Sequence, residues 1–393
     1  MKRKIPLSLA VCLMVITASA TVLVVLLYLL LSGSSLIGGT SWYSKLNEIT
    51  KKIDEMYYGE ISPAALADGA AAGLVEGLGD PYAGYYDAEE TEETALSNSG
   101  EKVGIGITPV PDAEAAALYV YRVDENGPAA AAGVQKGDRI TAVNDVAVAD
   151  AGYEAAVSAC AGEAGSTLTL QILRNGETLS LPCTRAEFEL TTVYPHMVGE
   201  IGYMQISRFN EKTPDQLIDA VEEMTAAGAR GLIFDLRLCG GGLVDATARA
   251  LDYLLPEGNI ISATYADGHS TVLHTSDKAE VNLPMAVLTT KNTASAAELF
   301  AAALRDYGKG VLIGSTTYGK GVMQRTFGLH DGSSVKFTIA EFVPPSGVSF
   351  NGVGLAPDIS VELTKEESAR FYYFTDEEDL HLNAALEYFG DLS

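Results

Sequence analysis

Basic side chains are scarce in this sequence. Lys and Arg together number 26 in a chain of 393 residues, whereas Asp and Glu number 52, so the formal net charge is −26. A surface of this sign repels the phosphate backbone of nucleic acids, and no basic stripe in the sequence compensates for it. We therefore expect no nucleic-acid partner, and the acidic surface favours solubility.

Cysteine and histidine are too few and too scattered for a disulfide framework or a metal site. The four cysteines are Cys12, Cys160, Cys183 and Cys239, they form no Cys-x-x-Cys pair, and the five histidines do not cluster. Cys12 lies in an apolar N-terminal run, which leaves an odd number of cysteines for the rest of the chain. Cys160 could pair with Cys183, but isolated buried thiols are the favoured state. We expect neither a metal ion nor another cofactor.

Charged residues are absent from positions 5–31, directly after the basic residues 1–4. An apolar run of this length spans a bilayer as a helix. A cleaved signal peptide is the alternative because residues 18–20 resemble a cleavage site, but the apolar run continues well past them and favours an uncleaved anchor. The positive charge before the span keeps the N-terminus cytoplasmic and predicts that the chain after Ser32 is extracytoplasmic.

Apolar periodicity divides the remaining chain into an arm, a β-domain and a core. Helical spacing over residues 42–58 and 64–78, with Pro63 opening the second stretch, predicts either a membrane-proximal spacer or a dimerisation arm. Short alternating runs then predict strands, and further on strands alternate with helices, as in βαβ units with an at least partly parallel sheet. The predicted β-domain strands are 103–107, 118–123, 138–143 and 168–173. The predicted core elements are strands 200–206, 231–236, 285–288 and 311–313 and helices 213–227 and 244–255.

The predicted fold class is therefore α/β (α+β) multidomain, with an N-terminal transmembrane helix, a helical arm, a β-domain and a core with a βαβ-type sheet. The last segment is acidic and contains aromatic residues, and we expect a surface helix there with a contact that leaves room for a homodimer or a higher oligomer. The predicted boundaries are residues 1–35 for the cytoplasmic end and anchor, 36–95 for the arm, 96–186 for the β-domain, 187–364 for the core and 365–393 for the tail.

Ser295 stands at the start of a helix-like segment that follows a buried strand. Such a serine is more often a helix cap than a nucleophile. Its neighbours Ala294, Ala296 and Ala297 are small, however, and the N–H of Ala296 lies in the first turn, where the helix dipole favours negative charge. The glycine turn at residues 240–242, after another strand, allows a similarly close approach. The two turns are candidates to hold an oxyanion at Gly241 and Ala296.

Lys320 is the candidate base for Ser295. No histidine stands in a comparable turn, whereas Lys320 lies in a glycine-flanked loop after the apolar strand 311–313. A lysine is ordinarily a solvated charge, but burial lowers its pKa and leaves it able to accept a proton from serine. Ser–Lys pairs are a known variant of the catalytic triad. Gln324 is placed to orient the amine.

The β-domain resembles a PDZ domain of the protease-associated type. The motifs that carry the likeness are Gly-Ile-Gly-Ile at 104–107, Gly-Pro-Ala at 127–129, Ala-Gly-Val at 132–134 and Lys-Gly-Asp-Arg-Ile at 136–140. The resemblance implies that Gly104, Ile105, Gly106 and Ile107 present backbone N–H groups to the terminal carboxylate of a peptide, which a neighbouring strand edge accepts as an added strand. The alternative is a small β-domain that binds nothing.

The chain from Leu46 to Leu363 resembles the C-terminal processing (tail-specific) peptidases, PDZ-containing serine proteases with a Ser/Lys pair. The matching motifs are Thr-Ala-Ser-Ala-Ala-Glu at 293–298, Tyr-Gly-Lys-Gly at 318–321 with Gln324, Asp-Leu-Arg at 235–237, Gly-Gly-Leu at 241–243 and Gly-Asp-Pro-Tyr at 79–82. The resemblance implies an endopeptidase that cuts proteins recognised partly by their C-terminal ends, with a PDZ domain that docks a substrate tail, gates the site, or does both. Ser295 would be its nucleophile, Lys320 its general base and Gln324 the residue that positions the base.

The sequence departs from the family pattern at two places. Cys239 and Gly240 replace the usual Asn and Pro, and Ala161 stands where relatives often have an arginine before the turn at 162–165, so a carboxylate-sensing arginine is not carried over. The alternative function is a catalytically silent or tightly gated scaffold that binds peptides through its PDZ domain. The presence of all three of Ser295, Lys320 and Gln324 favours the enzyme.

Overall fold

A computed structural model gives the structure of the protein and describes residues 14, 16–17, 19–24 and 41–391. No helix within these ranges has the length and apolar character needed to cross a membrane. The predicted span over residues 5–31 lies mostly outside them, so the anchor stays a prediction. By compactness the chain divides into one unit of residues 1–67 and a second of residues 68–393.

The first unit contains the helix α2 (Ser41–Met56) and the start of α3 (Pro63–Glu76). Both helices lie within two residues of their predicted positions, and proline stands in the first turn of α3, where its missing N–H costs nothing. On α2 the apolar side chains of Leu46 and Ile49 are exposed. This exposed apolar stripe leaves the choice between a spacer and a dimerisation arm open.

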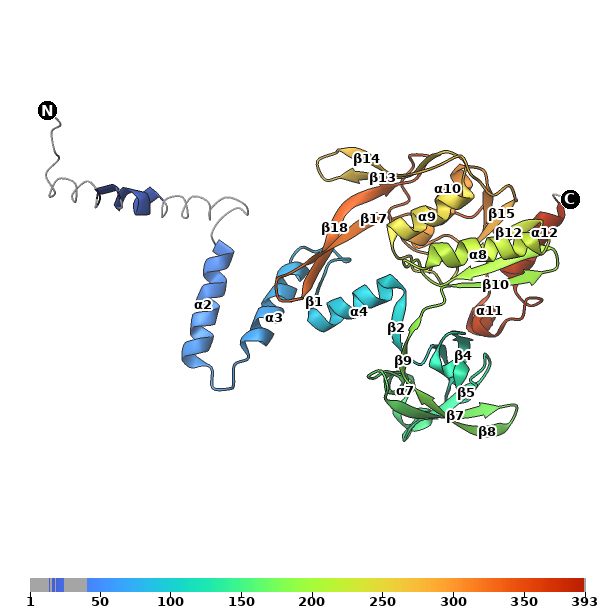
Figure 1. Ribbon diagram of the computed structural model, residues 1–393, viewed down its shortest axis with the longest axis horizontal. Coiled ribbons are helices and arrows are strands. Elements are labelled where there is room, and N and C mark those ends of the chain that lie inside the picture. Colours follow the sequence, from blue (N-terminus) through green and yellow to red (C-terminus); the bar gives the residue numbers. More distant parts are fainter. Residues whose placement is uncertain (1–13, 15, 18, 25–40, 392–393) are drawn as a thin grey trace, which may run out of the picture. The chain divides into compact units, whose positions relative to one another are not determined.

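The core of the second unit is a six-stranded sheet in which every strand except the edge strand β10 is parallel to its neighbour. The buried strands are almost continuously apolar, as expected for a parallel sheet covered on both faces. Figure 1 shows this sheet with its helices. In spatial order the strands are β10 (Val193–Val198), β11 (Ile201–Ile206), β12 (Gly231–Asp235), β15 (Met285–Thr289), β16 (Gly310–Gly314) and β19 (Ile359–Ser360).

The two faces of this sheet are covered by different parts of the chain. Met204, Phe234 and Val287 point to a cluster with α8 (Thr213–Ala226), α9 (Val244–Leu254) and α10 (Ala296–Asp306), three helices that connect the strands. The opposite face packs against the C-terminal helix α12 (Leu380–Asp391), which buries Leu382 and Phe389. The helix α12 thus lies at the surface with Asn383 and Glu387 exposed, and its apolar face stabilises the core by about 2 kcal/mol for each large side chain buried.

A second sheet connects the segment before the β-domain to the core. Its strand order is β1-β18-β13-β14, with β17 beside β18. The strand β1 (Gly84–Tyr86) pairs with β18 (Ser334–Val343), and the carboxylate of Asp80 accepts a hydrogen bond from the Thr338 N–H at 2.8 Å. Residues 79–82 are thus fixed beside the loop that carries Lys320. The other members are β13 (Gly258–Tyr265), β14 (Ser270–Ser276) and β17 (Val322–Gly328).

The β-domain is joined to the core by α4 (Ala88–Ser99) and by the two-stranded ribbon of β2 (Glu101–Gly104) and β9 (Ala186–Glu189). Its sheet surrounds a buried cluster that includes Leu118, Ile140 and Leu170. Residues 175–176 form a hairpin turn in which both φ angles are positive. The strands are β3 (Ile107–Asp112), β4 (Ala117–Val123), β5 (Arg139–Val143), β6 (Val146–Ala147), β7 (Thr167–Arg174) and β8 (Glu177–Thr184), and the helices are α5 (Pro128–Ala131), α6 (Val148–Ala151) and α7 (Tyr153–Cys160).

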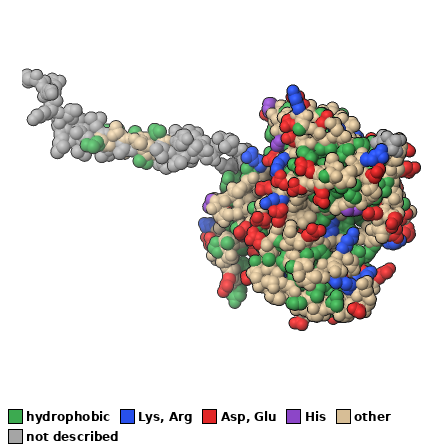
Figure 2. All heavy atoms as spheres, turned by 45° about the vertical axis from the view of Figure 1, so that its right-hand side comes forward, with side chains coloured by type: hydrophobic (Ala, Val, Ile, Leu, Met, Phe, Trp, Pro, Cys, Tyr) green, Lys and Arg blue, Asp and Glu red, His purple; other side chains and the backbone are tan. Residues whose placement is uncertain are grey.

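The start of the tail contacts the β-domain. After α11 (Lys365–Arg370), the turn η1 (Phe371–Tyr373) places the Tyr373 ring 4.5 Å from that of Tyr119 and the Tyr372 ring 5.1 Å from that of Tyr121. Acidic side chains are spread over the face shown in Figure 2, in keeping with the net charge of −26. As expected, Cys160, Cys183 and Cys239 are buried free thiols.

Candidate active site

Ser295 begins α10 in a backbone conformation that non-glycine residues rarely adopt, with φ 59° and ψ −122°. The turn before it is fixed to the end of β12, because the hydroxyl of Thr293 donates to the Leu236 carbonyl at 2.8 Å and that of Thr290 to the Arg237 carbonyl at 2.7 Å. Backbone strain held in place by surrounding bonds is concentrated at functional sites. The structure thus places Ser295 at a helix start beyond a buried strand, in the predicted position.

The glycine turn and the Ser295 turn lie against each other. The Ala294 N–H donates to the Cys239 carbonyl at 3.1 Å. Gly241 has φ 101°, and a Cβ at this residue would lie 2.8 Å from the Ala294 carbonyl and 3.0 Å from the Ala296 nitrogen. Only glycine fits this approach. The two predicted oxyanion donors, Gly241 and Ala296, are therefore neighbours in space.

The three glycines of this turn are not equivalent. A Cβ at Gly242 would lie 2.0 Å from the Phe209 carbonyl, whereas a Cβ at Gly240 would meet nothing within 4 Å. The turn therefore needs glycine at its second and third positions but not at its first. Cys239 beside it is fully buried, and burial raises the pKa of its thiol to about 12. This thiol stays protonated and fills space in the core.

A buried carboxylate, that of Glu298, connects the serine turn to the lysine loop. Its Oε2 accepts the backbone N–H groups of Ser295 and Lys320, each at 2.8 Å. Its Oε1 accepts the Thr317 hydroxyl at 2.5 Å and the Gly319 N–H at 2.7 Å. The backbone nitrogens of the two predicted catalytic residues thus lie on one oxygen atom. The structure therefore brings Ser295 and Lys320 together through a residue that is fully buried.

The environment of the Lys320 amine favours its neutral form. Burial lowers the pKa of Lys320 below its usual value, and the nearby charge of Lys336 lowers it further, against an opposing effect of Asp80. The nitrogen lies 4.4 Å from the centre of the Tyr82 ring. A ring face stabilises a cation, so Tyr82 offers the protonated lysine a resting contact. Tyr82 comes from the segment before the β-domain.

Gln324 lies on β17, on the same loop-to-strand segment as Lys320, but its amide has other partners. The amide nitrogen donates to the Val322 carbonyl at 3.2 Å and to the Thr338 hydroxyl at 3.1 Å. Among the described residues we find no hydrogen bond between Gln324 and Lys320. The Thr338 N–H also donates to the Asp80 carboxylate. In this structure Gln324 is therefore connected to the surroundings of Lys320 only through Thr338 and Asp80. The role of Gln324 as a positioner of Lys320 stays a prediction.

The loop at residues 104–107 has the backbone orientation that carboxylate binding requires. The Ile105 carbonyl accepts from the Ala129 N–H at 2.7 Å, and the Gly106 carbonyl from the Asp124 N–H at 2.9 Å. Among the described residues no peptide bond is cis, and in a trans peptide the N–H points opposite to the carbonyl. The N–H groups of Gly106 and Ile107 are therefore turned away from the β-domain. Gly104 belongs to the connecting ribbon, where it pairs with β9.

Arg237, directly before the glycine turn, is held by two buried carboxylates. Its guanidinium donates to both oxygens of Asp235, at 2.9 and 2.8 Å, and to both oxygens of Asp379 in the tail, at 2.8 and 2.6 Å. Burial alone would raise the pKa of Asp235, but the charge and hydrogen bonds of Arg237 hold it below its usual value. The start of the glycine turn is thus fixed to the C-terminal tail.

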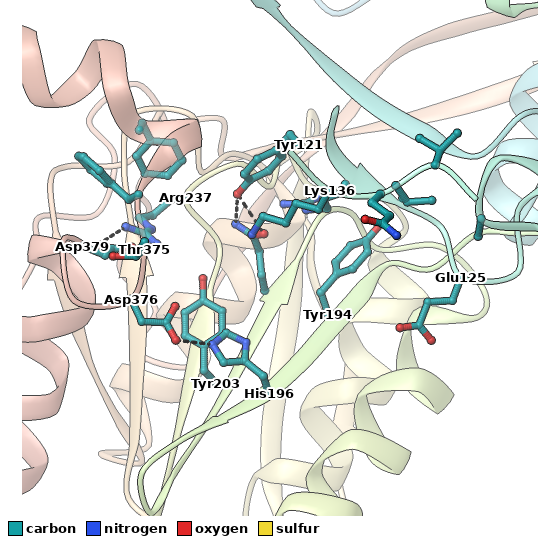
Figure 3. A pocket seen from close by; sticks show the side chains of 18 residues that line it. Tyr121, Glu125, Lys136, Tyr194, His196, Tyr203, Arg237, Thr375, Asp376 and Asp379 are labelled. Atoms are coloured by element: carbon teal, nitrogen blue, oxygen red, sulfur yellow. Dashed lines mark hydrogen bonds and ion pairs between the residues drawn. The ribbon is translucent and has the colours of Figure 1, made fainter. Parts of the chain in front are cut away.

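A further hydrogen-bond path leads from this ion cluster to the β-domain. The amide of Gln205 donates to Asp235 at 3.1 Å and to the Tyr121 hydroxyl at 3.1 Å. Tyr121, Gln205 and Arg237 border a cavity of about 500 Å³ between the β-domain, the core and the tail. In Figure 3 Tyr121 and Lys136 reach into this cavity from the β-domain side, while Arg237 and Asp379 lie on the opposite side. A displacement of the β-domain would disturb the bonds around Arg237.

Comparison with known proteins agrees with this arrangement. The chain is 33% identical over 372 residues to the carboxy-terminal processing protease CtpA of Bacillus subtilis, and the alignment covers 92% of this chain and 78% of that protein. The chain belongs to the carboxy-terminal processing proteases. A probable CtpA-like serine protease of Staphylococcus epidermidis is 30% identical, with 82% of this chain and 66% of that protein covered. The family is one of serine proteases with a PDZ domain.

Family models divide the chain in the same order as the domains. Residues 33–91 match the N-terminal domain of the activating protease CtpB, residues 103–183 a PDZ domain and residues 200–361 peptidase family S41. Among solved structures, a photosystem II D1 C-terminal processing protease is similar at 26% identity and a TM-score of 0.50, with 82% of this chain and 87% of that chain covered. A putative S41 protease from Bacteroides fragilis, at 21% identity and a TM-score of 0.55, shows the same fold over 76% of this chain and 88% of that chain.

Three contributors to the site were missed by the sequence reasoning. Glu298 was visible only as part of a motif, although a glutamate three residues after a serine is the spacing of a capping box and signals a tie to the serine backbone. Tyr82 and Asp379 come from opposite ends of the domain sequence, and no local pattern indicates that they meet the lysine loop and Arg237. Only the tertiary structure shows these contacts.

Proposed function

We propose that this protein is a serine endopeptidase in which Ser295 is the nucleophile and Lys320 the general base. The observation that carries the proposal is the Glu298 carboxylate, which accepts hydrogen bonds from the backbone nitrogens of both residues. This tie sets the serine turn and the lysine loop in one rigid unit. The lowered pKa of Lys320 supports its role, because a base must be partly neutral at working pH to accept the serine proton.

The chemistry that follows is acyl transfer. The Ser295 hydroxyl attacks the substrate carbonyl while the Lys320 amine takes the hydroxyl proton, and the N–H groups of Gly241 and Ala296 stabilise the oxyanion. The protonated Lys320 then gives its proton to the leaving amine as the acyl-enzyme forms. Water hydrolyses the acyl-enzyme in a second round with the same base. Gln324 in this scheme orients the amine once it turns toward it.

The PDZ domain, on this proposal, docks the C-terminal tail of a protein substrate and gates the protease core. Its support is the outward direction of the N–H groups at Gly106 and Ile107, together with the hydrogen-bond path from Tyr121 through Gln205 toward Arg237. The proposal also places the protein in a membrane, anchored by residues 5–31 with the protease outside the cytoplasm. Proteolysis of intact cells tests this topology, because an extracytoplasmic core would be digested and a cytoplasmic one protected.

A gated enzyme is favoured over a freely active one by the contacts of the site. The Lys320 amine lies over the Tyr82 ring, and Gln324 is bonded to Thr338 rather than to Lys320. Both groups would have to exchange partners before the reaction. The silent scaffold remains the second candidate, and it shares the PDZ domain but needs no reactive Ser295.

Casein hydrolysis by the full chain in detergent tests the assignment. Ser295→Ala and Lys320→Ala should each lower the rate about a thousandfold or more, since removing one member of a catalytic set disables the rest. Lys278→Ala is the matched control, because this lysine lies on the surface of the core with its side chain 84% exposed. Equal hydrolysis by all variants would remove Ser295 and Lys320 from the mechanism. No hydrolysis by any of them, with tail peptides still bound, would favour the scaffold.

The gating role has a separate test. Tyr121→Phe removes the hydroxyl that bonds Gln205, whereas Tyr119→Phe removes a hydroxyl from the same strand and serves as the control. We expect the first variant to change how strongly a tail peptide stimulates casein hydrolysis, and the second to leave stimulation as in the unmodified protein. Identical stimulation in both variants would show that the Tyr121 path carries no signal.

A further inference from the structure

The edge of β3 that faces helix α7 is closed by the chain's own residues. Tyr153, the first residue of α7, donates its hydroxyl to the Pro109 carbonyl at 3.0 Å. The nitrogen and the carbonyl of one strand residue point to the same edge, and residues two apart share that edge. The opposite edge of β3 pairs with β4. The edge toward α7 is therefore formed by Ile107, Pro109 and Pro111.

This edge lacks the groups that an added strand needs. Proline has no backbone N–H, so neither Pro109 nor Pro111 can donate to a peptide laid along β3. The Pro109 carbonyl, which would accept a peptide N–H, already accepts the Tyr153 hydroxyl. Ile107 keeps its N–H and directly follows Gly106, whose own N–H also points outward. Donors are thus present at the loop and missing along the strand.

A bound tail would meet these positions in a fixed order. With its terminal carboxylate at the loop of residues 104–107 and its chain antiparallel to β3, its last residue lies beside Ile107. The third residue from the end then lies beside Pro109, and the fifth beside Pro111, because only alternate residues face the edge. The last residue can pair through both of its backbone groups, the third meets no donor and an occupied carbonyl, and the fifth meets only the Pro111 carbonyl.

We propose that the PDZ domain binds a protein tail through its terminal carboxylate and the backbone of its last residue, and that it makes no backbone hydrogen bond to the third residue from the end. The inference rests on the proposed docking function and narrows its substrate class to chains with a free C-terminal carboxylate. Affinity for the tail depends mainly on charge-assisted bonds to the loop N–H groups, which are stronger than neutral ones. Pro109, Pro111 and Tyr153 are the residues that set this specificity.

The experiment uses the full chain in detergent, with Ser295→Ala to prevent cleavage, and measures fluorescence polarisation of a short labelled peptide with a free carboxylate. Changing the carboxylate to a carboxamide should weaken binding about tenfold or more, because hydrogen bonds to a charged group are lost. Replacing the amide N–H of the third residue from the end with an ester oxygen should change affinity less than about twofold, since that N–H has no free acceptor.

A double variant tests whether Pro109 and Tyr153 are what prevents backbone pairing with the third residue from the end. Pro109→Val with Tyr153→Phe restores a donor and frees the carbonyl, so the ester peptide should now bind about fivefold more weakly than the amide peptide. Pro182→Val is the matched control, because it makes the same change on β8, at the other end of the same sheet. The control should leave the two peptides equal in affinity. Equal affinity in the double variant would overturn the assigned roles of Pro109 and Tyr153.

The experiment distinguishes a failure of the proposed docking function from a failure of this inference about its specificity. If the carboxamide peptide binds as well as the carboxylate peptide, the docking function falls, and this inference with it. If the carboxylate is required but the ester peptide binds about fivefold more weakly to the chain that keeps Pro109 and Tyr153, docking stands and the inference is overturned.

Discussion

The substitution Glu298→Gln should abolish most of the activity while the protein stays folded. The Glu and Gln side chains have nearly the same shape. The Gln amide, however, has one acceptor oxygen and one donor group where the Glu carboxylate has two acceptor oxygens. All four partners of Glu298 are donors: the N–H groups of Ser295, Gly319 and Lys320 and the Thr317 hydroxyl. In one orientation the amide nitrogen faces the N–H groups of Ser295 and Lys320, and in the other it faces that of Gly319 while the Thr317 hydroxyl rotates to accept from it.

The magnitude follows from the one or two bonds that are lost. Each hydrogen bond to a charged group contributes about 1.5–3 kcal/mol, so the free energy of unfolding should fall by about 1.5–6 kcal/mol. A domain with a stability of about 5–15 kcal/mol loses much of its margin but retains its fold at low temperature. The loss concerns the relative position of Ser295 and Lys320, and a misplacement of about 1 Å costs about a hundredfold in rate.

The assay combines urea unfolding with casein hydrolysis at a temperature where the variant is folded. The control is Glu341→Gln, the same change at a carboxylate on β18 that accepts a hydrogen bond from the Ser349 hydroxyl. We expect Glu298→Gln to lower kcat about a hundredfold or more and the control to change it less than about threefold. Activity of a folded Glu298→Gln protein within a few-fold of the unmodified chain would refute the argument that this carboxylate aligns the pair.

Three further predictions follow from the same contacts. Activity should rise with pH through a pKa below the usual lysine value, because Lys320 acts only when deprotonated and its pKa is lowered. A pH–rate profile in which activity falls with rising pH below pH 9 would contradict this. Phe389→Ala should lower the free energy of unfolding by about 3 kcal/mol, measured in urea, since it leaves a cavity between α12 and the sheet; a change below about 1 kcal/mol would show that α12 is not part of the core. Asp379→Asn should lower hydrolysis more than substrate binding, measured as kcat against KM, because it loosens Arg237 before the glycine turn; an effect on KM alone would place Asp379 in substrate binding.

The core elements were predictable because their patterns are local. The strands that became β11, β12 and β15 are short apolar runs, and the helices α8 and α9 begin and end within about two residues of the predicted positions, as expected when periodicity and end signals agree. Ser295 at a helix start and the adjacent glycine turn were likewise predictable from the order of strand, turn and helix.

What the sequence could not supply were contacts between distant segments. The packing of α12 depends on a face of the sheet that no local pattern indicates. For the acidic aromatic tail, the sequence therefore predicted only a surface helix. The lysine loop meets Tyr82, and Arg237 meets Asp379, only after the chain has folded. The prolines at 109 and 111 were visible, but their effect depends on which edge of β3 faces α7. The pairing register of β3 and its free edge both follow from the tertiary structure. A shift of one residue in the register would turn the opposite set of residues to that edge.

The most direct test of the central claim is the detection of an acyl group on Ser295. The full chain in detergent is incubated with an activated p-nitrophenyl ester, quenched in acid and mapped by peptide mass spectrometry. The account predicts an acyl adduct on Ser295 that forms faster as the pH rises and about a hundredfold or more slowly in Lys320→Ala. An adduct on another residue, or formation at an unchanged rate in Lys320→Ala, would contradict it.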